Sequence, residues 1–584
     1  MAAVSAVLLL LAACMGSTAA FRPVVPRSYP TSLLSQEVTR EEEVRSSLKE
    51  ARETYEGVFA GVDDSFLGAL KSRRSYLSIV AERLVQSLDD MQIAARKKDR
   101  KNAAVPSITT KPRIVVLGSG WGAYSFLKTV DASMYDVTVV SPRNYFLFTP
   151  MLAASAVGTV EFRSICEPIR NANELAEYLE ATAVAINATR RVVSCRSVKC
   201  MGVSCDVAEF EVPYDHLIVA VGATSNTFGI KGVRENCIFL KQIEDAASLR
   251  TAILSCFERA NVPDLSDEER RSALSFVVVG AGPTGVEFTS ELRDFIETEG
   301  RRYYGKLLRF VSIKLLEAGD AVLPVFDKAL QQEALTKLLN RKTSLIEEGL
   351  VEREPTQVLL KAGVSEIAEK EVVLSSGEKI PYGFCVWAAG NGPVPLVLDL
   401  IEGIPEQREQ QSKARGRLVT DPWMRVLGAD GVLGIGDCAF CSESPLPATA
   451  QVASQEGSYL GRLFSKGYDM RIMPVPSKKL EQRDSDELTI SERVSIGELG
   501  VRKEERAFAK PFQFLNLGIL AYVGASEALA QVAVDEKQIL GSGPVGYLLW
   551  RGIYWSKQVS WRNRLLVAVD WAKGRLFGRD IGSI

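Results

Sequence analysis

The stretch RIVVLGSGWGAYSFLKTV, residues 113–130, joins an apolar run, a glycine-rich turn and a helix-like run. The same order returns in LSFVVVGAGPTGVEFTSEL, residues 274–292. A strand that enters such a turn before a helix is typical of a dinucleotide-binding βαβ unit. One turn of this kind can be a mere structural bend, whereas two in this order predict that the chain binds two dinucleotides.

The first turn has the features of a pyrophosphate-binding loop. Gly118 permits the tight bend, Gly120 allows the backbone to approach the phosphates, and Ala123 replaces the third glycine of the pattern. The free N–H groups of the following helix then face the anion. The acidic residue that usually ends the second strand is absent, because residues 141–143 read Ser-Pro-Arg. We therefore expect Ser141 or backbone groups to hold the ribose.

The second turn is complete, with Gly280, Gly282 and Gly285, and Glu317 ends the strand-like RFVSIKLLEAG. A carboxylate accepts hydrogen bonds from both ribose hydroxyls and repels a 2′-phosphate, so this unit is predicted to favour NADH over NADPH. The distance along the chain from turn to carboxylate exceeds the usual ~20 residues. A longer helix is therefore expected between them.

A third sequence motif indicates which dinucleotide the first unit binds. In GVLGIGDCAF a buried strand ends in Gly436 and Asp437, whose carboxylate can accept a hydrogen bond from a ribityl hydroxyl of a flavin. We therefore expect FAD to bind non-covalently in the first unit and NADH to bind in the second. A protein that binds this pair is predicted to be a flavoprotein reductase. The predicted fold class is α/β, with two Rossmann-type domains, the NADH domain inserted in the FAD domain, and a C-terminal membrane-anchoring helical region.

Composition excludes several other classes of function. The 584 residues are 46% apolar and 24% charged with a formal net charge of −2, which gives no overall basic footprint for nucleic acid. His216 is the only histidine, so a multi-histidine metal site is ruled out and a Ser-His-Asp triad is disfavoured. Its apolar, strand-like setting predicts a structural histidine. We expect no metal and no nucleic acid.

Longer motifs identify a family. VVSPRNYFLFTPMLAASAVGTVEFRSICEPIR, VGAGPTGVEFTSEL, WAAGNGP, GIGDCA, PATAQVASQEGSYLGRLF and WRGIYWSKQVSWRNRLLVAVDWAKGRLFGRDI together resemble type II NADH:quinone oxidoreductase, the non-proton-pumping alternative NADH dehydrogenase. The resemblance covers residues 111–584. It implies hydride transfer from NADH to FAD and then two electrons to a quinone, either ubiquinone or plastoquinone. The cofactor-binding residues expected from turns and resemblance together are Gly118, Gly120, Trp121, Gly122, Ala123, Ser141, Pro142, Arg143, Gly222, Gly280, Gly282, Pro283, Thr284, Gly285, Glu317, Ala389, Gly390, Gly436, Asp437, Ala450 and Gln451.

Three residues are expected to take part in catalysis. Gln451 and Gln455 are four apart and share one helix face, where neutral amides can donate to a quinone carbonyl in an apolar pocket. The resemblance places this helix over the flavin and at the quinone site. It also places Glu287 near the nicotinamide and the flavin, where it could tune charge transfer; a structural role is the alternative.

Rival readings depend on the cysteines. A disulfide reductase needs a C-x4-C pair soon after the first glycine turn, where only Cys166 occurs. Cys195, Cys200 and Cys205 have that spacing but lie elsewhere, and Cys438 and Cys441 form a C-x2-C beside the presumed flavin strand. Both groups are expected to be ordinary buried thiols, with a redox role left open. A soluble NADH-dependent disulfide or ferredoxin reductase, and a flavin-bound redox sensor without turnover, remain the alternatives.

The last 42 residues predict attachment to a membrane surface. Seven basic residues oppose Asp570 and Asp580 between 543 and 584, and four of the chain's seven tryptophans fall there. No apolar run outside the N-terminus reaches the ~18 residues of a spanning helix. The region is therefore expected to lie in the interface, with Trp550, Trp555, Trp561 and Trp571 at the headgroups and cations toward anionic lipid.

The N-terminus and the linkers complete the organisation. MAAVSAVLLLLAACMGSTAAF has the pattern of a signal peptide and, with RPVVPRSYPTS, resembles the two-part leader of complex plastids. A plastid (thylakoid) membrane is thus expected, with the mitochondrial inner membrane as the alternative; a homodimer is among the assemblies considered.

The predicted segments are 1–20 for targeting, 21–110 for a partly helical extension, 111–270 and 388–475 for the FAD domain, 271–387 for the NADH domain, and 476–584 for a charged insert and the anchor.

Overall fold

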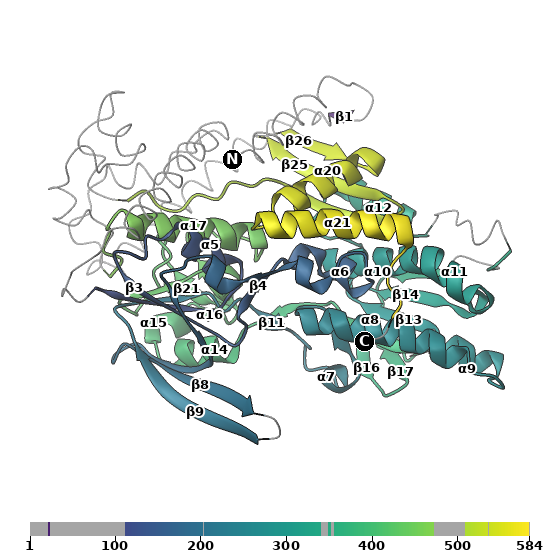
Figure 1. Cartoon of the computed structure of the whole chain (residues 1–584), viewed down its shortest axis with the longest axis horizontal. Coiled ribbons are helices and arrows are strands. Elements are labelled where there is room, and N and C mark those ends of the chain that lie inside the picture. The colour runs from purple at the N-terminus through teal and green to yellow at the C-terminus, as the bar shows by residue number, and fades with distance from the viewer. Residues whose placement is uncertain are drawn as a thin grey trace, which may run out of the picture.

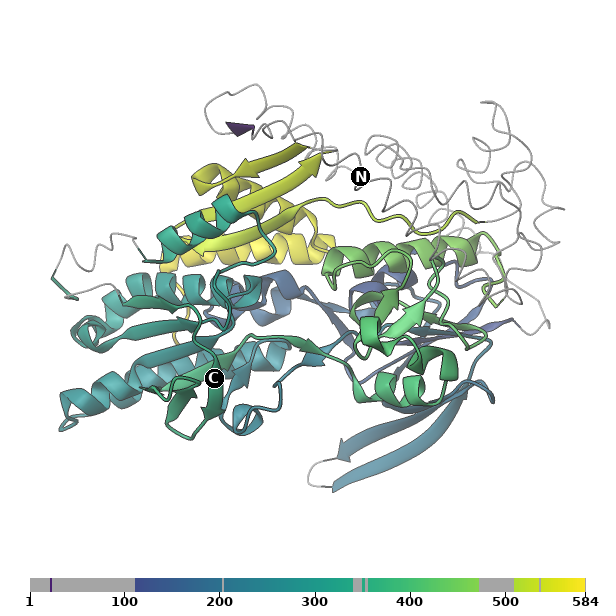
Figure 2. The same cartoon turned by 180° about the vertical axis from the view of Figure 1, so that it is seen from behind.

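The computed structural model describes residues 22–23, 111–201, 204–339, 349–351, 355–471, 509–534 and 537–582. Two nucleotide-binding units lie side by side, and the C-terminal elements lie across the top of the molecule (Figures 1 and 2). The predicted targeting segment, almost all of the predicted extension at 21–110 and most of the charged insert fall outside the described residues. Strand β1 (Arg22–Pro23) pairs antiparallel with β26 (Lys537–Gly541).

The first unit is a five-stranded parallel sheet in the order β22-β10-β2-β3-β6. One face packs on helices α5 (Trp121–Thr129) and α17 (Ala450–Ser465), and the other packs on an antiparallel sheet, β7-β8-β9, and on α14 (Pro395–Glu402). Because both faces are covered, strands β10 and β22 are buried along their whole length, and β2 is buried from Ile114 onward. The strands of this unit are β2 (Arg113–Leu117), β3 (Asp136–Ser141), β6 (Glu177–Glu180), β7 (Thr182–Asn187), β8 (Val192–Met201), β9 (Ser204–Pro213), β10 (His216–Val219) and β22 (Val432–Gly434).

The second unit repeats this plan in the order β12-β19-β13-β14-β15. Helices α8 (Ile243–Ala260) and α10 (Pro283–Phe295) cover one face, and the antiparallel sheet β16-β17-β18 covers the other. Its strands are β12 (Ile238–Phe239), β13 (Ser275–Val279), β14 (Ser312–Leu316), β15 (Thr356–Leu359), β16 (Val364–Ile367), β17 (Glu371–Leu374), β18 (Lys379–Pro381) and β19 (Phe384–Trp387).

One domain boundary differs from the expectation. Strand β12 pairs in parallel with β19, and α8 packs against the same sheet, although both precede residue 271. The second unit therefore begins before β12. Two short strands pair antiparallel between the units. Strand β11 (Thr224–Ser225) lies where the chain passes from the first unit to the second, and β20 (Asn391–Gly392) lies where it returns.

The C-terminal region contains a sheet that the helical prediction for this region missed. Strands β24 (Ile519–Gly524), β25 (Glu527–Val534) and β26 form an antiparallel meander, followed by α20 (Gly543–Ser556) and α21 (Trp561–Phe577). Strand β24 packs on α10 of the second unit, and α20 packs on β25. This region is therefore a small α+β module that is docked on the nucleotide-binding core.

Candidate functional site

The first glycine turn leaves open space where a phosphate group would lie. Gly118 has a φ of +109°, and a Cβ there would come within 2.5 Å of the carbonyl oxygen of Ala220. A Cβ on Gly120 or on Gly222 would meet nothing within 4 Å. Helix α5 begins directly after this turn at Trp121, so its free N–H groups face the opening. The cradle fits a dinucleotide diphosphate.

Ser141 and Arg143 lie beside this turn, and the binding of the ribose by Ser141 stays a prediction. The hydroxyl of Ser141 donates to Ser119 Oγ at 3.1 Å and accepts the backbone N–H of Arg143 at 3.2 Å. The guanidinium of Arg143 donates to Gln242 Oε1, which belongs to the second unit. The Ser-Pro-Arg segment thus ends β3 at the turn and reaches across to the neighbouring unit.

The second glycine turn has the same geometry and brings its acidic residue into place. Gly280 has a φ of +103°, and a Cβ on Gly285 would lie 1.9 Å from the carbonyl oxygen of Gly280. Glu317, just after β14, accepts hydrogen bonds from Ala281 N at 2.7 Å and from Gly319 N at 2.8 Å. The carboxylate thus lies at the turn despite the long spacing, because helical residues 283–310 fold back between the two strands. Pro283 is the first residue of α10 and Thr284 the second.

The residues that follow β19 and β22 adjoin these turns. Gly390 has a φ of +72°, and a Cβ there would lie 2.5 Å from the Phe228 ring; Ala389 packs against the apolar core of the second unit. Asp437 follows β22, and burial raises the pKa of its carboxyl while Lys241 and Arg417 counter this.

Glu456 is a functional candidate that the sequence analysis missed. Its Oε2 accepts the backbone N–H of Gly436 at 2.6 Å, and the side chain is buried. Burial raises the pKa of this carboxyl to about 8. The available signal was the acidic residue inside the quoted SQEG motif, one residue before Gly457.

The amides of Gln451 and Gln455 hold a segment of backbone. Gln451 donates from Nε2 to Gly518 O at 2.9 Å and accepts Leu517 N at 3.0 Å. Gln455 makes the same pair of bonds with Leu515, at 2.9 Å and 3.0 Å. Residues 515–518 lead into β24. Both amides therefore connect α17, of which Ala450 is the first residue, to the C-terminal module, and their action on a quinone stays a prediction.

Glu287 lies in the contact between α10 and the C-terminal module. Its Oε1 accepts Tyr522 N at 3.3 Å, and burial raises the pKa of the carboxyl to about 8. Glu291, one turn along, is also buried and has a pKa of about 7 for the same main reason, with Arg579 acting against the shift. The two carboxyls form a buried acidic row below β24.

The cysteines have the environment of ordinary thiols. Cys438 and Cys441 are buried and free, and burial raises their pKa values to about 12 and about 11. Cys195 is buried and free, with its pKa raised to about 11. The backbone positions of Cys200 and Cys205 are opposite each other in the register of β8 and β9. A raised thiol pKa disfavours the nucleophilic thiolate.

His216 lies in the core of the first unit, where its ring packs edge-on against Phe464 at 5.0 Å. Burial lowers its pKa to about 4. Within the described residues, no group of His, Cys, Asp and Glu has the arrangement of a metal site.

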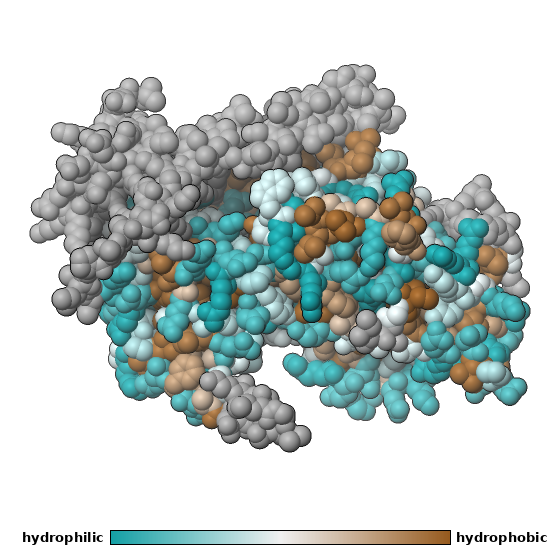
Figure 3. Space-filling model, in the orientation of Figure 1, coloured by the Kyte–Doolittle hydropathy of each residue, from teal (hydrophilic) through white to brown (hydrophobic). Residues whose placement is uncertain are grey.

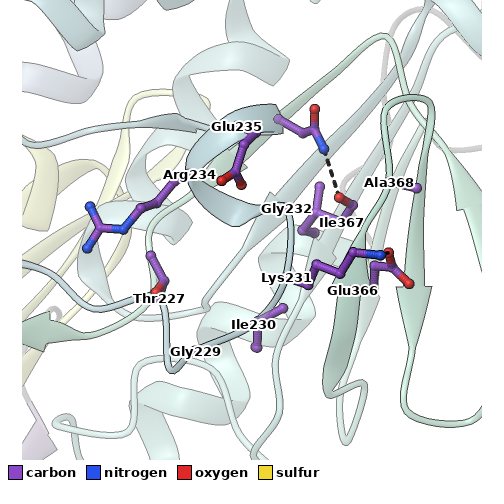
Figure 4. A pocket seen from close by; sticks show the side chains of 11 residues that line it. Thr227, Gly229, Ile230, Lys231, Gly232, Arg234, Glu235, Glu366, Ile367 and Ala368 are labelled. Carbon is purple, nitrogen blue, oxygen red and sulfur yellow. Dashed lines mark hydrogen bonds and ion pairs between the residues drawn. The ribbon is translucent and has the colours of Figure 1, made fainter.

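A cavity of about 530 Å³ opens in the second unit, away from the expected site residues. Figure 4 shows it between the loop that precedes α7 (Val233–Asn236) and strand β16, with Lys231 and Glu366 facing each other at 2.7 Å. None of the residues expected from the sequence to bind a cofactor lines it.

The outer face of α21 is apolar. Leu565, Val569 and Leu576 are 66%, 51% and 76% exposed, while Asn563 and Val567 face inward and are buried. Figure 3 shows hydrophobic side chains gathered along this helix. In the described part of the chain, no helix combines the length and hydropathy that a membrane crossing requires.

The four tryptophans of this module differ in their exposure and in their contacts. Trp561 is 74% exposed, whereas Trp550 is buried against Tyr522 and Ala528. Trp571 stacks under Arg551 at 4.0 Å, and Trp555 donates to Arg564 O at 2.9 Å. The expectation of four headgroup tryptophans is therefore wrong for Trp550, because this side chain supplies the core of the small module.

Comparison with known proteins agrees with this architecture. Residues 112–457 match the family described as pyridine nucleotide-disulphide oxidoreductase, and residues 516–580 match the NDH2 C-terminal domain. A probable NADH dehydrogenase of Dictyostelium discoideum is 36% identical over 87% of this chain and 98% of its own length. An external alternative NADH-ubiquinone oxidoreductase, mitochondrial, of Yarrowia lipolytica is 39% identical over 82% of this chain and 81% of its own.

Among solved structures, NDH2 from Plasmodium falciparum in complex with NADH has 25% identity and a TM-score of 0.64, and the match covers 81% of this chain and 100% of that one. The chain therefore belongs to the pyridine nucleotide-disulphide oxidoreductase family and, within it, to the type II NADH:quinone oxidoreductases.

Proposed function

We propose that the flavin of this NADH:quinone oxidoreductase is FAD, held between the first glycine turn and the Gly436–Asp437 turn. The observation that carries the proposal is the pair of open cradles. Gly120 and Gly282, one in each unit, both have free space beside them at the start of a helix. Two diphosphates can therefore be bound at once, as transfer of a hydride from one dinucleotide to the other requires.

The bound flavin would accept a hydride from NADH and release two electrons to a quinone. The chain's own residues bind and orient the partners. Glu317, at the second turn, is positioned to accept hydrogen bonds from the NADH ribose. Asp437 would do the same for the ribityl chain of the flavin, and Lys241 and Arg417 help to keep its carboxyl ionised.

The quinone side of the site involves the C-terminal module. The N-terminal turn of α17 carries Gln451, which holds the backbone at 517–518, while Glu287 lies buried behind β24. A carboxyl with a pKa of about 8 can bind a proton near neutral pH. We propose that Gln451 and Gln455 orient the quinone head group in two ways, through their amide groups and by holding residues 515–518 in place. We also propose that Glu287 serves as a proton donor on this side.

The membrane partner follows from the exposed face of α21. Leu565, Val569 and Leu576 can enter the interface, and the exposed cations Lys573 and Arg575 can approach anionic headgroups. We propose ubiquinone as the acceptor and a mitochondrial membrane as the location, because the relatives from Yarrowia lipolytica and Arabidopsis thaliana are named as mitochondrial ubiquinone oxidoreductases. This choice replaces the plastid expectation, and a homodimer stays a prediction.

The test is an assay of the full-length chain extracted from membranes. We expect released flavin to elute as FAD and NADH oxidation to depend on a short-chain ubiquinone analogue. Lipoamide, glutathione disulfide and ferredoxin serve as the competing acceptors. Release of FMN would contradict the cofactor assignment, and turnover that requires a disulfide or ferredoxin would contradict the quinone assignment.

A further inference from the structure

A lysine lies at the junction of the two units with no close carboxylate. Lys241 follows β12 and precedes α8, and its Nζ donates to Asn391 Oδ1 at 2.6 Å. Among the described residues it forms no ion pair within 4.0 Å, and it is half-buried. Partial burial of a cation with no carboxylate within 4.0 Å costs free energy, and an anionic ligand placed beside it would lower that cost.

The strand register places this lysine at the nucleotide-binding edge. Strand β12 pairs in parallel with β19, Phe239 beside Trp387, so Lys241 lies just past the carboxyl ends of two neighbouring strands. Ligands of open α/β sheets bind at this edge. The next residue, Gln242, accepts a hydrogen bond from Arg143 of the first unit. Lys241 is therefore located between the two expected dinucleotides.

The charges around Lys241 neutralise it only in part, so an anionic ligand beside it would be favourable. Asp437 interacts with it electrostatically and raises its pKa, but burial is the larger effect and lowers the pKa overall. Asp437 also interacts with Arg417, so it is opposed by two cations. Asp437 is thus opposed by two basic side chains, while the second carboxyl at this turn, Glu456, accepts Gly436 N and has its pKa raised to about 8 by burial.

We propose that Lys241 stabilises the reduced form of the bound flavin and so raises its reduction potential. The uptake of a hydride adds one negative charge to the flavin, and a fixed ammonium nearby favours the charged form over the neutral one. The hydrogen bond to Asn391 fixes the direction of the side chain. This inference rests on the proposed function, because it requires a flavin in the first unit.

The test measures the midpoint potential of the flavin in the full-length protein by equilibration with reference dyes. Lys241→Gln keeps a donor for Asn391 and removes the charge, while Lys241→Arg keeps the charge. We expect K241Q to lower the ratio of reduced to oxidised flavin about tenfold at a given potential, which is about 30 mV for a two-electron couple. K241R should stay near the wild-type potential.

A matched control separates charge from structure. Asn391→Ala removes the hydrogen bond that directs Lys241 but keeps the ammonium charge, so its potential should shift less than that of K241Q. If K241Q loses flavin, potentials are compared on reconstituted K241Q and K241R at equal flavin content. An unchanged potential in K241Q overturns the inference, and a higher KM for NADH without a change in potential would assign Lys241 to the diphosphate of NADH instead. A wild-type protein without flavin or quinone activity would contradict the proposed function, which is a separate outcome.

Discussion

Glu456 on α17 accepts a hydrogen bond of 2.6 Å from the backbone N–H of Gly436, in the turn where the flavin is expected. The same helix holds residues 515–518 through Gln451 and Gln455. One helix therefore connects the Gly436–Asp437 turn to the segment that leads into the C-terminal module. A displacement of the C-terminal module is therefore expected to move α17 and to alter the turn at which the flavin is expected to bind.

Glu456 tests this connection directly. Glu456→Gln retains an acceptor for Gly436 N, whereas Glu456→Leu leaves that N–H unpaired and buried, which costs about 1–3 kcal/mol. We expect E456L to lose bound flavin and to melt at a lower temperature, with E456Q close to wild type. The flavin-to-protein absorbance ratio and a thermal melt measure both effects. Equal flavin content in E456L and wild type would show that this bond does not hold the turn.

The crossing of α5 and α17 depends on a glycine pair. A Cβ on Gly457 would lie 2.1 Å from the carbonyl oxygen of Gly122, so Gly457→Ala forces the helices apart. We expect it to destabilise the protein by more than about 1 kcal/mol. The matched control is Gly552→Ala in α20, where a Cβ meets nothing within 4 Å and where alanine gains about 1 kcal/mol of helix propensity. Denaturant unfolding compares them, and equal effects would contradict the close packing.

Glu317 is expected to select NADH. Its carboxylate is held at the second turn by two backbone N–H groups, which Gln can satisfy only in part. Glu317→Gln removes the repulsion of a 2′-phosphate, so discrimination against NADPH should fall by roughly 1–3 kcal/mol, the scale of one charge-assisted contact. The ratio of kcat/KM for the two donors reports this change. A ratio equal to that of the wild type would assign selection to other residues.

The buried carboxyl of Glu287 predicts a dependence of stability on pH. Its pKa rises from 4.5 to about 8 on folding, so between these values the unfolded chain releases a proton that the folded chain keeps. The free energy of unfolding should therefore fall as the pH rises through this window. Glu287→Gln keeps an acceptor for Tyr522 N and removes the titration, so its advantage over wild type should grow from pH 5 to pH 9. Urea titrations across this range check the trend, and a constant difference would contradict it.

The outer face of α21 is expected to carry membrane binding. Leu565→Ser with Val569→Ser should weaken binding to anionic vesicles, because full burial of each apolar side chain is worth about 1.5 kcal/mol or more. Val325→Ser is the control, since Val325 is 62% exposed in the second unit. Vesicle co-sedimentation measures the loss. Unchanged sedimentation of the double variant would place the contact on another surface.

The sequence alone determined the two nucleotide-binding units. Glycine turns such as 118–123 and 280–285 are local patterns, in which a positive φ and a close backbone approach exclude other residues, so they can be read without tertiary information. The apolar strands before them are equally local. The motifs GIGDCA and PATAQVASQEG lie at strand β22 and at the start of α17, and their roles toward a flavin and a quinone stay predictions.

Tertiary structure alone decided what the polar side chains contact. The hairpin of β24 and β25 turns at Ala525 and Ser526, both with positive φ, and this turn lacks the Asn-Gly or Asp-Gly signal that would have revealed it. That hairpin brings residues 515–518 to Gln451 and Gln455, 60 or more residues away in the chain. Long-range pairings of this kind have no local pattern, because their free energy comes from burial against α10 and α17 and not from the conformation of the segment itself.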